Sequence, residues 1–308
     1  MNLFETKANY QSGAFDKRKY IKEMHRLHER LFEYAKFIRD TDIARIEITD
    51  GTVVMTSRAV GIKILCDARD MRIAPIETLN FGTYEIAELE MMLRLIKPGY
   101  TVFDIGANIG WHSINIAKSL PDASVFAFEP IPETFAYLKK NVEMNGVSNV
   151  QLYNFGFFNE EKELKFYFCD DSSASTSIAN IEGRDDARIM SCSVRKLDDF
   201  VAEHDLKVNF IKCDVEGAEL FVFQGGMESI RRHKPIILSE MVRKWCAKFD
   251  YSPNKIIDLI SGAGYKCFTV KGSKLVEFFK MDDNTVETNF FFLDPDEHAK
   301  YIQSLVAG

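Results

Sequence analysis

One short stretch of the chain, TVFDIGANIGWHS at residues 101–113, constrains the fold more than any other. It begins as an apolar run typical of a buried strand and continues, after two glycines, as a helix. In an open α/β sheet, ligands bind beyond the carboxyl ends of the strands, where glycine lets backbone amides approach a ligand closely. The stretch therefore predicts a strand–turn–helix unit that holds a ligand.

Strands and helices alternate from about residue 83 onwards. A helix at 83–99 precedes the first strand, and the pattern then predicts strands at 101–105, 124–128, 150–153, 208–213 and 235–239, and helices at 111–119, 132–145, 218–223 and 253–261. Such alternation is typical of a parallel sheet covered by helices on both faces. ELKFYFC and RIMSCSV add two strands around the polar loop DDSSASTSIAN, which is either a lid or a plain connection, and GYKCFTV and TNFFFLD supply two final strands.

The first eighty residues follow a different pattern. Residues 16–40 carry apolar side chains at helical spacing, and we expect a helix that packs on the core, with a dimer contact or a lid as alternatives. ARIEITDGTVVMTSR predicts a β-hairpin turning at Asp50-Gly51, to which GIKILCDA can add a third strand. We therefore divide the chain into an extension at 1–80 and a main domain at 81–308.

Composition excludes several classes of protein. The formal net charge of −7 gives no overall basic field that would recruit nucleic acid. The six cysteines contain no C-x-x-C pair and are interpreted as reduced thiols. No apolar run is long enough to cross a membrane, so we expect a cytoplasmic protein without membrane insertion.

The spacing of the glycine turn selects the kind of ligand. Asp104, Gly106 and Gly110 follow D-x-G-x-x-x-G, which departs from the G-x-G-x-x-G of dinucleotide-binding folds. A carboxylate beside the turn suits a cationic ligand such as S-adenosylmethionine, which carries a sulfonium and an ammonium. Glu129 ends the second strand, where a carboxylate can accept hydrogen bonds from both ribose hydroxyls.

Three segments together resemble the FkbM family of S-adenosylmethionine-dependent methyltransferases: VFDIGANIGWHS, FAFEPIPETFAYLKKN and FIKCDVEGAELFVFQGG. The resemblance covers roughly residues 83–268. It implies a Rossmann-like, seven-stranded class I methyltransferase sheet, mostly parallel with an antiparallel last strand. It also implies methyl transfer to a hydroxyl, typically of a sugar or natural product, with S-adenosylhomocysteine as the product.

The resemblance also assigns residues to the cofactor. It places the turn residues around the methionine portion, Glu129 and Pro130 at the ribose, Phe155 and Gly156 beside the adenine, and Glu85 at an acidic position that the family often carries. The turn residues are Asp104, Gly106, Ala107, Asn108 and Gly110.

Three carboxylates are predicted at one rim of the sheet. Asp214 and Glu216 end the fourth strand and Glu240 ends the fifth. They can act as a general base with its electrostatic neighbours, hold Mg²⁺, or offset helix dipoles. We favour the first interpretation, in which Asp214 also touches the cofactor, and predict no metal.

Two further residues near the turn have competing roles. His112 is either a structural residue or a catalytic group that contacts substrate or cofactor. Lys212 is expected on the side of its strand opposite Asp214, as a salt-bridge partner.

Rival functions lack their motifs. A nicotinamide oxidoreductase would carry G-x-G-x-x-G, and a base-methylating enzyme would carry an Asn/Asp-Pro-Pro-aromatic tetrad where this chain has DVEG. A non-catalytic scaffold stays open as an alternative. The acceptor we expect is a small hydroxylated molecule, namely a sugar, nucleotide-sugar or glycan intermediate, and the extension is a candidate contact for a homodimer.

Overall fold

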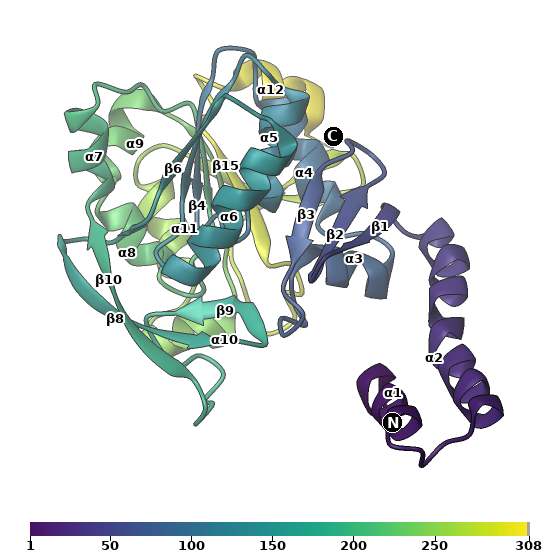
Figure 1. The fold of residues 1–308 in the computed structure, drawn as a ribbon. Coiled ribbons are helices and arrows are strands. Elements are labelled where there is room, and N and C mark those ends of the chain that lie inside the picture. Colours follow the sequence, from purple (N-terminus) through teal and green to yellow (C-terminus); the bar gives the residue numbers. More distant parts are fainter. Residues whose placement is uncertain (307–308) are drawn as a thin grey trace.

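The computed structural model describes residues 1–306, without the side chains of residues 174 and 175. Its centre is an eight-stranded sheet in the order β14-β13-β15-β12-β11-β4-β5-β6 (Figure 1). Its strands are β4 (Thr101–Ile105), β5 (Ser124–Phe128), β6 (Val150–Tyr153), β11 (Phe210–Cys213), β12 (Ile236–Glu240), β13 (Lys266–Lys271), β14 (Lys274–Phe278) and β15 (Asn289–Leu293). Strands β4, β5, β6, β11 and β12 pair in parallel, whereas β15 is antiparallel to both of its neighbours.

Helices cover both faces of this sheet. Because side chains alternate along a strand, Val102 packs on one face and Phe103 on the other. The Phe103 face packs against α7 (Leu197–Glu203), α8 (Glu219–Gln224), α9 (Met227–His233) and α11 (Asn254–Ser261). The Val102 face packs against α4 (Ile86–Leu95), α5 (Trp111–Ser119) and α12 (Ala299–Leu305), while α6 (Pro132–Asn145) joins α5 in a neighbouring cluster.

The predicted α/β class and the antiparallel last strand are confirmed, with one added strand. Strand β14 pairs antiparallel with β13 at the edge and makes eight strands of the expected seven. Its sequence, KLVEF, follows β13 after a two-residue Gly-Ser turn, so the two strands form one hairpin.

The N-terminal extension consists of helices that stand apart and strands that join the body, where Ile62 and Ile64 pack with Leu138 and Val142 of α6. Helices α1 (Leu3–Gln11) and α2 (Lys17–Phe37) stand away from the body (Figure 1), followed by the short 3₁₀ turn η1 (Ile38–Asp40). The predicted hairpin and third strand are present as β1 (Ile43–Thr49), β2 (Thr52–Ser57) and β3 (Lys63–Cys66). Helix α3 (Ala74–Phe81), which the sequence pattern did not predict, leads into the main domain.

The expected packing role of the first long helix is wrong. None of the residues of α2 is buried, and its contacts are with α1 and η1. Amphipathic spacing shows that a helix has an apolar face, but it does not show what covers that face.

An insertion between β6 and α7 carries a second small sheet. Its order is β7-β10-β8-β9, from β7 (Gly156–Phe157), β8 (Lys162–Cys169), β9 (Ser172–Ser177) and β10 (Arg188–Arg195). The polar segment predicted as a loop is therefore partly a strand, because Ser172 and Ser177 pair with β8. Helix α10 (Arg243–Cys246) and the 3₁₀ turn η2 (Ala247–Phe249) follow β12. Within residues 1–306, no helix is both long and apolar enough to cross a membrane.

Candidate active site

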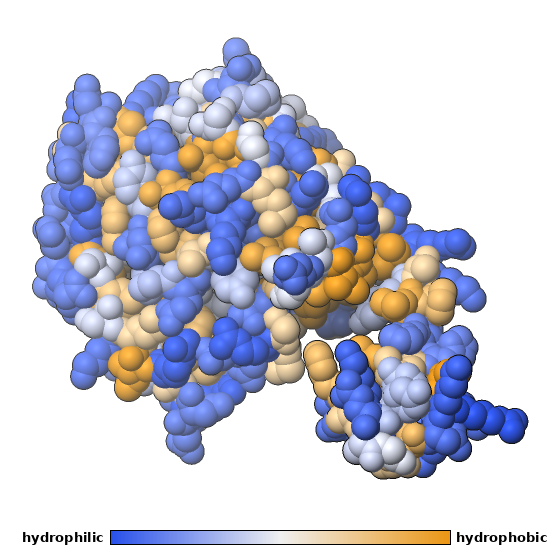
Figure 2. Space-filling view, viewed as in Figure 1, coloured by the Kyte–Doolittle hydropathy of each residue, from blue (hydrophilic) through white to orange (hydrophobic). Residues whose placement is uncertain are grey.

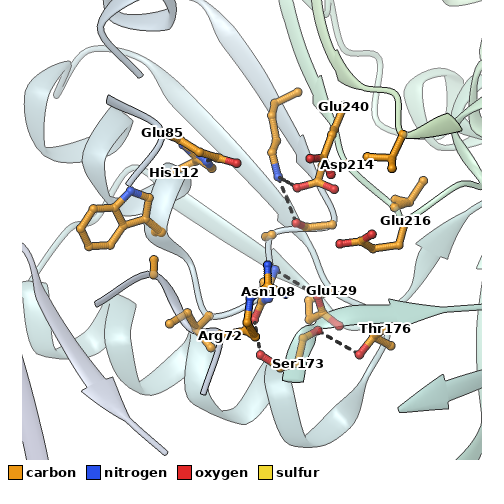
Figure 3. Close-up of a pocket in the computed structure, with 18 of the residues that line it drawn as sticks. Arg72, Glu85, Asn108, His112, Glu129, Ser173, Thr176, Asp214, Glu216 and Glu240 are labelled. Carbon is orange, nitrogen blue, oxygen red and sulfur yellow. Dashed lines mark hydrogen bonds and ion pairs between the residues drawn. The ribbon is translucent and has the colours of Figure 1, made fainter. Parts of the chain in front are cut away.

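A cavity of about 410 Å³ lies at the carboxyl ends of β4, β5, β11 and β12 (Figure 3). Its volume falls in the range typical of small-molecule sites. The predicted site residues that line it are Glu85, Gly106, Ala107, Asn108, His112, Glu129, Pro130, Asp214, Glu216 and Glu240. The cavity thus joins residues that are up to 155 positions apart in the chain through the shared edge of one sheet.

The turn after β4 requires glycine at two positions for different reasons. Gly106 has φ +79°, and an added Cβ would lie 1.8 Å from the Asp214 carbonyl oxygen. Gly110 has φ +93°, and an added Cβ would lie 2.6 Å from Leu138 Cδ1, so this glycine lets α5 pack against α6. Gly106 lines the cavity and Gly110 does not, which assigns Gly110 a packing role in place of the expected contact.

Glu129 is held at the cavity by the turn itself. Its Oε2 accepts the Asn108 backbone N–H at 3.0 Å, and its Oε1 accepts the Ile131 N–H at 2.9 Å. Burial raises the pKa of Glu129 to about 7, even though these two N–H groups favour the ionised form. The carboxylate is thereby oriented, with lone pairs left to accept hydrogen bonds from a ligand.

Asp104 lies beneath the turn and not in the cavity. It is fully buried, its Oδ2 accepts the Ser113 hydroxyl at 2.5 Å, and its Oδ1 is 3.5 Å from Lys212 Nζ. The contact with a cofactor that the sequence predicted is therefore replaced by a supporting role. The reason is that Asp104 precedes the end of β4, where side chains alternate into the core.

Lys212 lies on the same side of β11 as Asp214, so its expected orientation is wrong. Residues two apart on a strand share a face. The Lys212 ammonium donates to the Asp214 carboxylate and to the Gly106 carbonyl, each at 3.2 Å, which confirms its salt bridge. Burial alone would lower the pKa of Lys212, but Asp214 and Asp104 raise it, so the lysine is charged.

The three carboxylates of the rim converge. Asp214, Glu216 and Glu240 each present an oxygen within 4.8 Å of the others. Burial would raise the pKa of Asp214, but Lys212 and a hydrogen bond with Glu240 lower it. Burial and the charge of Asp214 hold the pKa of Glu216 and of Glu240 well above the usual range. The rim therefore places one carboxyl whose pKa is lowered next to two carboxyls whose pKa values are raised.

A second wall of the cavity carries an acid–imidazole pair. Glu85 Oε2 lies 2.7 Å from His112 Nε2. Glu85 precedes α4 with a left-handed backbone, at φ +44°, and His112 belongs to the first turn of α5. Both side chains are visible beside the rim in Figure 3.

The residues predicted to flank the adenine lie elsewhere. Phe155 packs into an aromatic cluster with Phe128, Phe157 and Phe200, and Gly156 packs against Pro130 and Val194. Neither lines the cavity. An apolar residue after the third strand can line a ligand site or pack on the core, and Phe155 packs on the core.

Several lining residues lie outside the predicted set. Aromatic walls come from Tyr84, Trp111, Phe166 and Trp245, and polar groups come from Arg72, Ser173, Thr176, Glu182, Lys244 and Thr288. Trp111 directly follows the glycine turn and could have been selected on that ground. The others come from loops, from the insertion and from the short helix α10, where sequence spacing carries no positional signal.

The residues present fit S-adenosylmethionine. A glycine that tolerates no side chain borders the cavity, and a buried, oriented glutamate lines it. Carboxylates next to that turn complement a cationic ligand. The Trp111 Nε1 and His112 Nδ1 atoms are buried and have no hydrogen-bond partner among the described residues, so the cavity offers further polar contacts.

The order of the strands, the glycine turn at Gly106 and the buried Glu129 at the expected ribose position together define a class I S-adenosylmethionine-dependent methyltransferase domain. Comparison with known families identifies it further. The family model of the methyltransferase FkbM domain matches residues 104–267, more than half of the chain, and the chain belongs to this family.

Curated relatives carry methyltransferase names. The chain is 30% identical over 142 residues to methyltransferase 1 of Beauveria bassiana, covering 40% of this chain and 57% of the relative. It is 28% identical over 138 residues to the hexuronic acid methyltransferase AglP of Haloferax volcanii, covering 44% and 54%. It is 28% identical over 157 residues to the 31-O-demethyl-FK506 methyltransferase FkbM of Streptomyces tacrolimicus, covering 42% and 60%. The chain thus spans little more than half the length of these relatives.

Replacement of Glu129 tests the ribose contact. Glu129→Ala should weaken S-adenosylhomocysteine binding at least tenfold, because hydrogen bonds to a charged group contribute about 1.5–3 kcal/mol. Isothermal calorimetry measures the affinity. Glu143→Ala, an exposed glutamate on α6, is the matched control and should bind like the wild type. Equal affinity in both variants would contradict the assignment.

Proposed function

We propose that this protein transfers a methyl group from S-adenosylmethionine to a hydroxyl of a small acceptor, a sugar or a glycan or natural-product intermediate. The observation that carries the proposal is a single cavity that joins Glu129 and the glycine turn to the rim of three carboxylates. The names of two relatives, a hexuronic acid methyltransferase and a 31-O-demethyl-FK506 methyltransferase, support an oxygen acceptor of this kind.

One group of residues would bind the cofactor, and a second group transfers the proton of the acceptor hydroxyl. The bound cofactor supplies an electrophilic methyl group. Glu129 and the backbone of Gly106 and Asn108 would hold it, which provides the positioning that accelerates a bimolecular transfer. Asp214, ionised beside Lys212, takes the hydroxyl proton, and Glu216 and Glu240 hydrogen-bond the acceptor.

Substitution at the rim tests the proton-transfer role. Asp214→Asn should lower turnover about 10²- to 10⁴-fold, the usual contribution of a general base, and Glu216→Gln should lower it less. Release of S-adenosylhomocysteine with a panel of sugar acceptors measures turnover, and calorimetry checks that the cofactor still binds. Asp122→Asn, at an exposed site, is the control. Unchanged turnover in both rim variants would exclude the role, and cofactor binding without any turnover would favour a scaffold.

The convergence of the rim favours a metal-assisted version of the same reaction as the second candidate. Three carboxylate oxygens within 4.8 Å of one another match the preference of Mg²⁺ for oxygen ligands, and a bound cation would acidify a coordinated hydroxyl.

Chelation separates the two candidates. Turnover should survive exhaustive dialysis against EDTA, because Asp214 accepts the proton without help. A loss of at least tenfold that added Mg²⁺ restores would favour the metal-assisted candidate.

We also propose that α1 and α2 contact a second copy of the chain. Leu31 and Phe32 of α2 are 54% and 66% exposed, and Phe4 of α1 is 83% exposed. Figure 2 shows apolar residues gathered where this extension leaves the body. Apolar residues on α2 recur at alternating three- and four-residue steps, as in helices that pair with helices.

All six cysteines are free thiols, which supports the proposed cytoplasmic location.

Sedimentation tests this contact. The double variant Leu31→Glu, Phe32→Glu should shift the chain from dimer to monomer, because two charges would be buried without partners. Lys36→Glu changes the net charge equally at an exposed site and should leave the dimer intact. A monomeric wild type would contradict the proposal.

A further inference from the structure

The pair of Glu85 and His112 has the marks of a functional group. Glu85 precedes α4, where a side chain ordinarily caps the helix, yet it makes no cap hydrogen bond. Its backbone adopts the left-handed conformation that residues other than glycine rarely adopt. Its carboxylate instead contacts His112 Nε2 at 2.7 Å. Glu85 thus has a left-handed backbone and does not cap α4, and its carboxylate contacts the His112 imidazole instead.

This contact fixes which ring nitrogen is free. A carboxylate oxygen accepts hydrogen bonds, so in the neutral imidazole His112 Nε2 carries the proton and Nδ1 carries the lone pair. Nδ1 is buried and has no partner among the described residues, although His112 lines the cavity and is only 6% exposed. A buried acceptor of this kind calls for a donor, and a ligand in the cavity can supply one.

The pair lies at the rim end of the cavity. The ring centroid of Tyr84, which precedes Glu85, lies 6.5 Å from that of His112. Tyr84, Glu85 and His112 line the same cavity as the three carboxylates of the rim. Figure 3 shows Glu85 and His112 at the same height in the view as Asp214 and Glu240 but on the opposite side of the cavity, and Glu129 lies lower. The groups around the pair are Tyr84, Glu88, Lys212, Asp214 and Glu240.

We infer that His112 Nδ1 accepts a hydrogen bond from a second hydroxyl of the acceptor, next to the one that is methylated, and that Glu85 is a positioning residue that fixes the orientation and tautomer of His112. The inference rests on the proposed function and replaces the cofactor contact that the sequence suggested for Glu85. The methylated hydroxyl then donates its hydrogen bond to Asp214 while its neighbour donates to His112, so the acceptor is held at two points. The alternative donor with the same chemistry is the ammonium of the cofactor.

Calorimetry distinguishes the two donors. Glu85→Ala and His112→Asn should bind S-adenosylhomocysteine, which carries the ammonium, within threefold of the wild type. Glu129→Ala is the positive control for lost affinity, and Glu90→Ala, exposed on α4, is the matched control. A loss of tenfold or more in Glu85→Ala would assign the pair to the cofactor and overturn the inference.

Nitrogen NMR of histidine-labelled protein tests the positioning role without any acceptor. The His112 ring, identified by its loss in His112→Asn, should be protonated at Nε2 and bare at Nδ1 in the wild type. Glu85→Ala should give exchange between tautomers, and Glu85→Gln, which retains an acceptor oxygen, should restore the Nε2–H form. An Nδ1–H form in the wild type, or an unchanged ring in Glu85→Ala, would overturn the inference.

Turnover on methyl glycosides with methyl-labelled S-adenosylmethionine completes the test. Glu85→Ala should lower kcat at least tenfold with little change in the KM for the cofactor, and Glu85→Gln should recover part of the loss. Full kcat in Glu85→Ala would overturn the inference and leave the proposed function intact. If the wild type binds cofactor but methylates none of the glycosides, the proposed acceptor class fails, and the NMR and calorimetry still decide the role of the pair.

Discussion

A buried lysine connects the parts of this site. Lys212 on β11 contacts Asp104 on β4, the Gly106 carbonyl in the turn and Asp214 after its own strand. Removing one partner from a buried ion pair typically costs about 3–5 kcal/mol, because the remaining charge is left without compensation. This ammonium group therefore joins the glycine turn to the rim, alongside the backbone hydrogen bond from the Asp214 N–H to the Ile105 carbonyl.

This arrangement also separates the charges of the rim. Lys212 lowers the pKa of Asp214, whereas burial and the charge of Asp214 raise the pKa of Glu216 and of Glu240. The cation beneath the turn thus distinguishes Asp214 from the two glutamates. Gly106 tolerates no side chain because the Asp214 backbone passes against the turn, where the Asp214 N–H donates to the Ile105 carbonyl at 3.1 Å.

The sequence predicted the parts of the fold whose signals are local. The helices 111–119 and 132–145 and the strands 101–105, 124–128 and 150–153 agree with the structure to the residue, because each is bounded by glycine, proline or polar residues. The prediction that α2 packs on the core was wrong, because no residue of α2 is buried. The roles of Asp104 and Phe155 were not predictable from position alone, because one residue along a strand separates core from cavity. The Glu85–His112 contact joins residues 27 apart and has no motif.

Strand β9, whose Ser173 and Thr176 line the cavity, is attached to the site by a few polar contacts, whereas the strands of the central sheet are joined by ladders of backbone hydrogen bonds. The Ser173 hydroxyl donates to Asn108 Oδ1 at 3.3 Å, the Ser177 hydroxyl donates to the Glu216 carbonyl at 2.8 Å, and Asp70 accepts the Ser173 N–H. Strand β9 belongs to the small sheet and shares no ladder with the central one. Displacing β9 would therefore break these polar contacts without unpairing any strand of the central sheet.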